Sequence, residues 1–142
     1  MKGLKILILG IVGYVGIVVA FEAFLGIFQP SNESTIVITT IDTDGVAEDR
    51  VVSPVRDGGE LYVSANHWPR SWYKRARANP EVRVTEDGTT KDYTAVPVTG
   101  SEHDRLATEH AHPFLFRVLT GFPPRDFLHL QPREASGATS GE

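Results

Sequence analysis

The chain has 142 residues, no cysteine and a formal net charge of −4. The absence of cysteine excludes disulfides, thiolate nucleophiles and cysteine metal sites. The acidic balance argues against nucleic-acid binding by the chain as a whole, because such binding needs a net basic face that displaces counterions from phosphates. Once the terminal segments are set aside, about 100 residues remain for a globular core, which is enough for one domain.

The N-terminal segment is apolar over residues 4–28, where the only charged residues are Lys5 and Glu22. At about 1.5 Å per residue, a helix of this length can cross a bilayer. We therefore expect residues 1–29 to be a membrane anchor that contacts the lipid bilayer through residues 4–28.

The basic start of the segment leaves an alternative open and predicts an orientation. Lys2 and Lys5 also fit the start of a cleavable signal peptide, for which Val18-Val19-Ala20 offers a small-residue cleavage site. Cleavage there would leave an apolar remnant in water, so we favour the anchor. Residues 29–48 contain no Lys or Arg, and the positive-inside rule places the N-terminus in the cytoplasm and the domain outside. The expected localisation is a single-pass membrane protein.

After a short polar linker at residues 30–33, the pattern changes to runs rich in β-branched and aromatic residues. Asp-Gly pairs lie between several of these runs, and they supply the positive φ that tight hairpin turns need. The pattern predicts an antiparallel, mainly β domain over residues 34–132. Its expected strands are residues 34–41, 50–56, 60–66, 81–86, 91–98 and 126–131.

Two helical segments interrupt the strands. Residues 69–80 contain helix-forming residues and end at a proline. A second helix is expected to begin with Ser101 as its N-cap, and Pro113 then breaks it before a short helical turn at residues 114–119. Residues 133–142 lack apolar periodicity and are expected to form a flexible tail.

This order of elements fits a small split β-barrel preceded by one transmembrane helix. The most specific local piece is Trp72-Tyr73, followed by Ala78-Asn79-Pro80-Glu81-Val82. It resembles the split-barrel flavin- and deazaflavin-dependent reductases, a family that includes deazaflavin-dependent nitroreductases and is related to pyridoxamine-phosphate oxidases. The resemblance covers about residues 36–100 and is looser from 101 to 131.

The resemblance implies a redox cofactor, FMN or a deazaflavin, that lies against the barrel at the seam of a homodimer. Its ring would lie near the end of the third strand, and its phosphates near the start of the first short helix. No metal ligand is implied, and no catalytic side chain is needed, because the cofactor would carry the chemistry. The matching cofactor-binding positions are Arg50, Ser64, Ala65, Asn66, Arg70, Trp72, Tyr73, Lys74 and Arg75.

The basic helix has a physical reason to bind phosphate, and a simpler alternative. Free backbone N–H groups at a helix N-terminus favour an anion, and Arg70, Lys74 and Arg77 recur at i, i+4 and i+7 on one face. A solvated face, or one that rests on anionic lipid, would show the same pattern. Trp72 and Tyr73 are of a kind that packs in cores more often than it stacks on cofactors.

Two further features bear on ligands. His110 and His112 are two residues apart and cannot share a helical face as an i, i+4 metal-binding pair does, so we expect no metal site. Trp68, in a loop before the first short helix, is expected to line a ligand groove or to touch the membrane interface.

The first hairpin departs from the family pattern. Members that bind the deazaflavin carry a Gly-Arg-Lys-Ser-Gly-like loop, whereas residues 42–49 here are acidic and would repel phosphates. The leading hypothesis is a membrane-anchored oxidoreductase-like domain that uses a flavin or deazaflavin for hydride transfer to a quinone-like or nitro-aromatic acceptor. The alternative is a non-catalytic split-barrel module that binds a ligand or serves a membrane complex.

Overall fold

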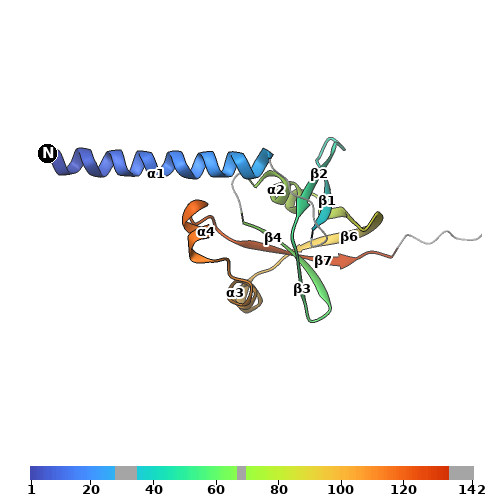
Figure 1. The fold of residues 1–142 in the computed structure, drawn as a ribbon. Coiled ribbons are helices and arrows are strands. Elements are labelled where there is room, and N and C mark those ends of the chain that lie inside the picture. Colours follow the sequence, from blue (N-terminus) through green and yellow to red (C-terminus); the bar gives the residue numbers. More distant parts are fainter. Residues whose placement is uncertain (28–34, 67–69, 135–142) are drawn as a thin grey trace, which may run out of the picture.

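The computed structural model describes residues 1–27, 35–66 and 70–134 (Figure 1). A long N-terminal helix, α1, runs past a small β domain, and three short helices lie around the sheet. The expected linker at residues 30–33, Trp68 and most of the expected tail lie outside the described residues.

The domain is mainly β, as its sequence predicts. Every strand pair is antiparallel. The helices are α1 (Lys2–Ile27), α2 (Ser71–Ala78), α3 (Gly100–Glu109) and α4 (Phe114–Leu119). The strands are β1 (Ile36–Ile41), β2 (Ala47–Val52), β3 (Pro54–Asp57), β4 (Glu60–Ala65), β5 (Glu81–Glu86), β6 (Thr89–Pro97) and β7 (Asp126–Pro132).

One bend closes the sheet into a barrel. The strand order is β2-β1-β5-β6-β7-β4-β3, so β2 and β3 are the two edge strands. Only Ser53 separates them in the chain, and the two edges must therefore lie next to each other. The single strand expected at residues 50–56 is thus wrong: it is two strands that pair with β1 and with β4. Pro54 can begin β3 because proline is tolerated at the first residue of a strand.

The turns follow the Asp-Gly pairs of the sequence. Asp87 and Gly88 have φ of 49° and 76° and join β5 to β6. Two successive positive φ angles are the mark of the type I′ turn that matches the twist of paired strands. In the first hairpin, β2 already begins at Ala47, so the acidic segment expected as a loop is partly strand.

The core lies in two clusters on either side of the curled sheet. In one, α2 places Trp72, Tyr73 and Ala76 against strand residues such as Ile38 and Leu128. In the other, α3 contributes Leu106, which packs with residues of β3, β4 and β7. The sheet is therefore covered by α2 at one face and by α3 at the other, and both helices are held by buried apolar side chains.

The start of α3 differs from the sequence prediction. Thr99 is the N-cap and makes no side-chain capping hydrogen bond, so Ser101 is not the cap. Gly100, with φ of 66°, turns the chain into the helix one residue before Ser101. Glycine adopts this conformation without the steric cost that a Cβ would bring.

Helix α1 packs against α4 rather than standing free of the domain. The Tyr14 hydroxyl donates to the Val118 carbonyl oxygen at 2.8 Å, and the rings of Phe21 and Phe116 meet edge to face at 6.1 Å. A Cβ on Gly121 would lie 2.9 Å from Val18 Cγ1. Among the described residues, α1 is the one helix long and apolar enough to cross a membrane, judged by length and composition over Lys2–Leu25.

Replacing Leu128 by alanine tests the core. Leu128 is fully buried, and we expect Leu128→Ala to lower the free energy of unfolding by about 2–5 kcal/mol through lost burial and a residual cavity. Leu115 is 68% exposed, so Leu115→Ala is the matched control and should change it by less than about 0.5 kcal/mol. Denaturant unfolding of the full chain in one detergent measures both, and equal effects would contradict the packing described.

Candidate functional site

The end of β4 forms a polar corner. Asn66 Nδ2 donates to Ser64 Oγ at 2.8 Å, and Asn66 Oδ1 accepts a hydrogen bond from Arg125 Nε at 2.8 Å. Arg125 Nη1 also donates to the His110 carbonyl oxygen. Ala65, by contrast, is only 2% exposed and belongs to the core. Of the three β4 positions expected at the cofactor ring, two therefore present polar side chains at one place.

A cavity of about 260 Å³ lies beside this corner, next to α3, α4 and the segment that leads into β7. Most of its wall is apolar, and the polar side chains come from the polar corner, from His112 after α3, and from Arg117 and Thr120 at the end of α4. Its lining residues are Asn66, Ala107, Ala111, His112, Phe116, Arg117, Thr120, Phe122, Pro123 and Arg125. Of these, the sequence predicted only Asn66 as a site residue.

His112 contributes its ring to the wall of this cavity. Its Nε2 is buried and has no hydrogen-bond partner among the described residues, and its ring lies 5.0 Å from that of Phe116. Burial, helped by the nearby Arg125 charge, lowers the pKa of His112. The ring is therefore kept neutral in the folded protein at neutral pH.

The basic face of α2 is partly neutralised. Arg70 forms an ion pair with Asp126 at the start of β7 and lies 4.7 Å above the Tyr73 ring. Arg75 pairs with Glu48, and its Nε donates to Thr40 Oγ1 at 3.1 Å. Both arginines are thereby engaged within the protein.

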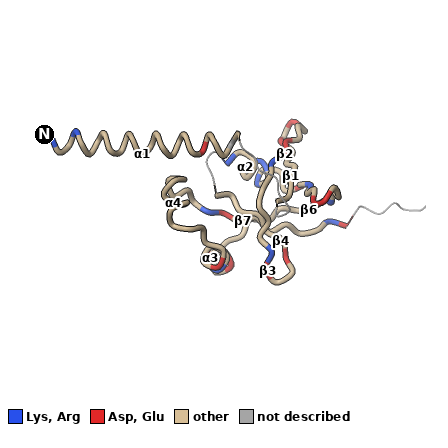
Figure 2. The backbone as a smooth tube through the Cα atoms, in the orientation of Figure 1, with Lys and Arg blue, Asp and Glu red and all other residues tan. Residues whose placement is uncertain are grey.

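The remaining charge on this helix is carried by Lys74 and Arg77. Both are exposed, and neither has a carboxylate partner among residues 1–27, 35–66 and 70–134. Arg50, the expected site residue on β2, is half-buried and likewise lacks an ion pair in this part of the chain. It lies two residues from Glu48, which places both side chains on one face of β2. Figure 2 shows the basic residues gathered on α2, close to β1 and β2.

Trp72 and Tyr73 lie in the core. Each is 8% exposed, and both belong to the cluster beneath α2. Their rings meet edge to face at 6.1 Å. Little of either ring surface is left for a cofactor to stack on within one protomer, so the core-packing interpretation accounts for both side chains.

Two acidic residues of the first hairpin, Asp42 and Asp49, make their hydrogen bonds within the hairpin. The Asp42 carboxylate accepts hydrogen bonds from the backbone N–H groups of Asp44 and Val46 at 2.9 and 2.8 Å, which is the side-chain turn that aspartate favours. Asp49 accepts from the Thr39 hydroxyl at 2.6 Å. Only Glu48 reaches a basic residue of α2, where it would compete with a phosphate for Arg75.

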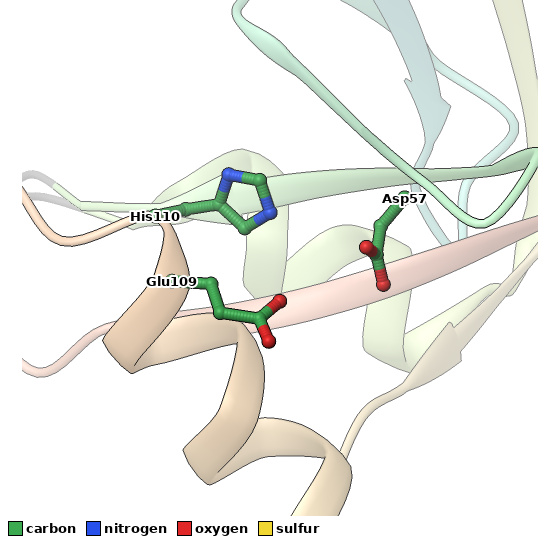
Figure 3. A group of neighbouring side chains, drawn as sticks. All are labelled: Asp57, Glu109 and His110. Atoms are coloured by element: carbon green, nitrogen blue, oxygen red, sulfur yellow. The ribbon is translucent and has the colours of Figure 1, made fainter.

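Asp57, Glu109 and His110 gather where β3 ends and α3 ends (Figure 3), with one potential ligand atom of each within 4.8 Å of the others. Arg105 already bridges the two carboxylates, at 2.6 Å from Asp57 and 2.9 Å from Glu109. The hydrogen bond from Arg105 lowers the pKa of Asp57. A cation would have to displace this guanidinium, so we assign no metal role to the group.

The three histidines of this region do not converge. His103 Nε2 lies 2.7 Å from the Arg125 carbonyl oxygen, whereas the His112 ring lines the cavity. The hydrogen bond to that carbonyl raises the pKa of His103. The two rings thus have opposite shifts in pKa from the ordinary value of 6.5.

These opposite shifts predict opposite effects on acid stability. A raised pKa stabilises the fold below the unfolded value, and that contribution is lost as pH rises through the folded pKa; a lowered histidine pKa costs stability as pH falls below the unfolded value. Between about pH 7.5 and about pH 5.5, we expect His103→Gln to lose stability relative to the parent chain, and His112→Gln to gain it. Denaturant unfolding at both pH values measures the difference, and shifts of the same sign would contradict the assignment.

A family model and several solved structures match this chain. The family model described as F420H(2)-dependent quinone reductase matches residues 17–113. The match begins within α1, so the last part of that helix falls inside the matched region, whereas the sequence resemblance had left the whole anchor outside it. No curated protein matches the chain.

Solved structures share the fold. A structure described as a domain-swapped dimer has a TM-score of 0.57 and 23% identity, over 71% of this chain and 82% of that one. HutZ, a heme storage protein from Vibrio cholerae, has a TM-score of 0.56 and 16% identity, over 73% and 84%. An F420-H2 dependent reductase, FDR-A, has a TM-score of 0.52 and 22% identity, over 72% and 98%. At these identities the likeness shows the fold, and the predicted split barrel is confirmed.

Proposed function

The chain belongs to the family of F420H(2)-dependent quinone reductases, and from this membership we propose that it is a membrane-anchored reductase that transfers a hydride from a reduced deazaflavin to a quinone-like acceptor. The family match over residues 17–113 carries the proposal. The family implies a deazaflavin; FMN is the second cofactor to test, and a nitro-aromatic compound the second acceptor.

The residues of α2 fit the anionic part of such a cofactor. Lys74 and Arg77 are exposed cations without carboxylate partners in the described residues, and they lie on a helix whose N-terminus favours phosphate. Arg50 would add a third positive charge from the neighbouring strand. The cofactor ring would then lie toward Ser64 and Asn66 at the end of β4. When bound, the deazaflavin supplies the hydride.

The cavity fits the acceptor better than it fits the cofactor. Its volume of about 260 Å³ is below the roughly 300–1,000 Å³ of pockets that enclose a whole drug-sized ligand, so it suits a single ring system. Phe116 and Phe122 supply apolar walls. Arg125 also lines the cavity, and its charge would stabilise the negative charge that develops on an acceptor oxygen as the hydride arrives.

We propose that α1, within residues 1–29, anchors the protein in the bilayer. Its length and composition support a span, and its contacts with α4 support retention of the helix. Cleavage after Ala20 would remove Tyr14 and Val18, which meet Val118 and Gly121. The orientation expected from Lys2 and Lys5 stays a prediction.

We also propose a homodimer. A structural neighbour of 23% identity is described as a domain-swapped dimer, and the exposed cations of α2 leave one side of the expected cofactor site open to solvent. A second protomer at this face would close that side and exclude water from the reacting atoms.

The non-catalytic alternative rests on one observation. Glu48 pairs with Arg75 and so takes one cation away from any phosphate. A chain that keeps the barrel but uses this pair only for stability would bind no deazaflavin, and binding is therefore the first property to measure.

Titration of the full chain in detergent with the reduced deazaflavin, followed by ligand fluorescence, tests the proposal. We expect saturable binding that weakens about tenfold in Lys74→Gln/Arg77→Gln, because two charge contacts that together contribute about 1.4 kcal/mol are lost. Arg83→Gln/Lys91→Gln is the charge-matched control, since both residues are exposed, on β5 and β6, and this variant should bind as the parent chain does. Absence of binding to the deazaflavin and to FMN would sink the reductase proposal.

Releasing Arg75 gives an independent check. Glu48→Gln removes its ion-pair partner, so we expect the affinity for the deazaflavin to rise several-fold if α2 holds the phosphates, by on the order of 1 kcal/mol. Asp49→Asn makes the same change in net charge one residue away, but Asp49 contacts Thr39 rather than a basic residue. Equal gains in the two variants would show a general charge effect and no role for Arg75.

A further inference from the structure

The position of α4 along α1 fixes how deep the domain sits if α1 crosses the bilayer. The face of α1 that approaches the domain includes Val18, Phe21 and Glu22, which together with Leu25 are less exposed than the other described side chains of the helix. They recur at i, i+3 and i+4, which is one helical face. Figure 1 shows α4 beside this part of α1 and not beyond its end.

The length of the span leaves no room for α4 outside the membrane. About 20 residues are needed to cross the hydrocarbon core, and Lys2 and Lys5 belong at its far surface. Twenty residues counted from Leu4 end at Ala23. Val18, which meets Gly121, is then about 7 Å inside that surface at about 1.5 Å per residue. Whatever packs on Val18 lies at acyl-chain depth.

The surface of α4 suits such a place. Phe114, Leu115 and Phe122 are 71%, 68% and 48% exposed, and the rings of Phe114 and Phe122 lie 6.1 Å apart. From residue 113 to residue 124 the only charge is Arg117, whose guanidinium lies 5.5 Å over the Phe122 ring and can extend to a lipid phosphate. The part of α1 between Lys5 and Glu22 likewise carries no charged residue, and α4 lies beside this helix (Figure 1).

Carbonyl oxygens at the end of α4 are hydrogen-bonded within the protein, which suits a medium without water. The last carbonyl oxygens of a helix are normally left for water. Here the Phe116 carbonyl accepts from the Thr120 hydroxyl at 2.9 Å, and the Val118 carbonyl accepts from the Tyr14 hydroxyl at 2.8 Å. The Arg117 carbonyl accepts from the N–H of Phe122 at 2.9 Å. Internal satisfaction of these groups is what a bilayer demands.

We propose that α4 and the turn to Phe122 insert into the leaflet that α1 leaves, so that the acceptor cavity receives its ligand from the bilayer. The inference rests on the proposed anchor and acceptor. Phe116 and Phe122 belong both to this inserted segment and to the cavity wall, so a lipophilic quinone can pass from lipid into the cavity without crossing water. Apolar faces of interfacial helices enter the headgroup and acyl boundary by about 5–10 Å. Val18 lies within this range, and Tyr14, which meets Val118, lies about 13 Å inside the surface by the same count.

The cysteine-free chain allows a direct measurement of depth. Single-cysteine variants Leu115→Cys, Ile8→Cys and Val46→Cys of the full chain carry a spin label in phosphatidylcholine vesicles. Accessibility to oxygen and to a water-soluble nickel chelate reports the depth of each label. The label at Ile8 is the reference for a position within the proposed span. Val46 is 60% exposed in the first hairpin, and its label is the reference for a position in water. We expect the label at Leu115 about 5–10 Å below the phosphates.

The three labelled positions distinguish a failure of the proposed α4 insertion from a failure of the proposed anchor. A label at Leu115 as accessible to nickel as that at Val46, with Ile8 buried, overturns the insertion of α4 but leaves the anchor intact. A label at Ile8 that is also in water overturns the anchor and, with it, this inference. Neither result bears on deazaflavin binding in detergent.

Turnover supplies a second readout. Phe114→Ser/Leu115→Ser alters exposed side chains that do not line the cavity. We expect the KM for a long-tailed quinone in vesicles to rise about tenfold, while turnover of a short, water-soluble quinone stays unchanged. Equal losses with both quinones would mean that the pair acts on the cavity itself and not on entry from lipid.

Discussion

The bend at Ser53 is the constraint on which the rest of the domain depends. One residue carries the chain from pairing with β1 to pairing with β4, and the sheet must curl for both pairings to exist. The curled sheet has a separate face for α2 and for α3. It also brings the end of β4 beside the start of β7, where Asn66 meets Arg125 and Arg70 meets Asp126. The polar corner is thus a product of barrel closure.

Features decided by near neighbours could be predicted from the sequence. Asp87-Gly88 predicted a hairpin turn, because the turn needs two positive φ angles that these residues tolerate. Pro113 predicted the break before α4, and the expected bounds of that helix agree with Phe114–Leu119. The division of one expected strand into β2 and β3 could not be predicted from the sequence. Only pairing with distant strands decides where a continuous run of β-forming residues leaves one partner strand for another.

The candidate site shows the same limit. Four basic residues at or within α2 could be identified from the sequence. In the structure, Arg70 pairs with a carboxylate 56 residues away, and Arg75 pairs with Glu48. The helix therefore presents only half of that positive charge to solvent. The cavity was not predicted because its wall consists of Asn66 and two segments beyond residue 106. No local sequence pattern predicts that these parts of the chain lie together. The burial of the His112 Nε2 nitrogen, which has no hydrogen-bond partner in the described part of the chain, follows from the same distant packing.

The contact between α1 and α4 has a consequence for how this protein could change over time. Gly121 leaves no space for a side chain against Val18, and the Tyr14 hydroxyl completes the hydrogen bonding at the end of α4. An unrelated hydrophobic helix would meet the length requirement but would supply neither the fit nor the hydroxyl. Helix α1 therefore cannot be exchanged for any other apolar helix, and it has to be inherited together with the domain it packs against.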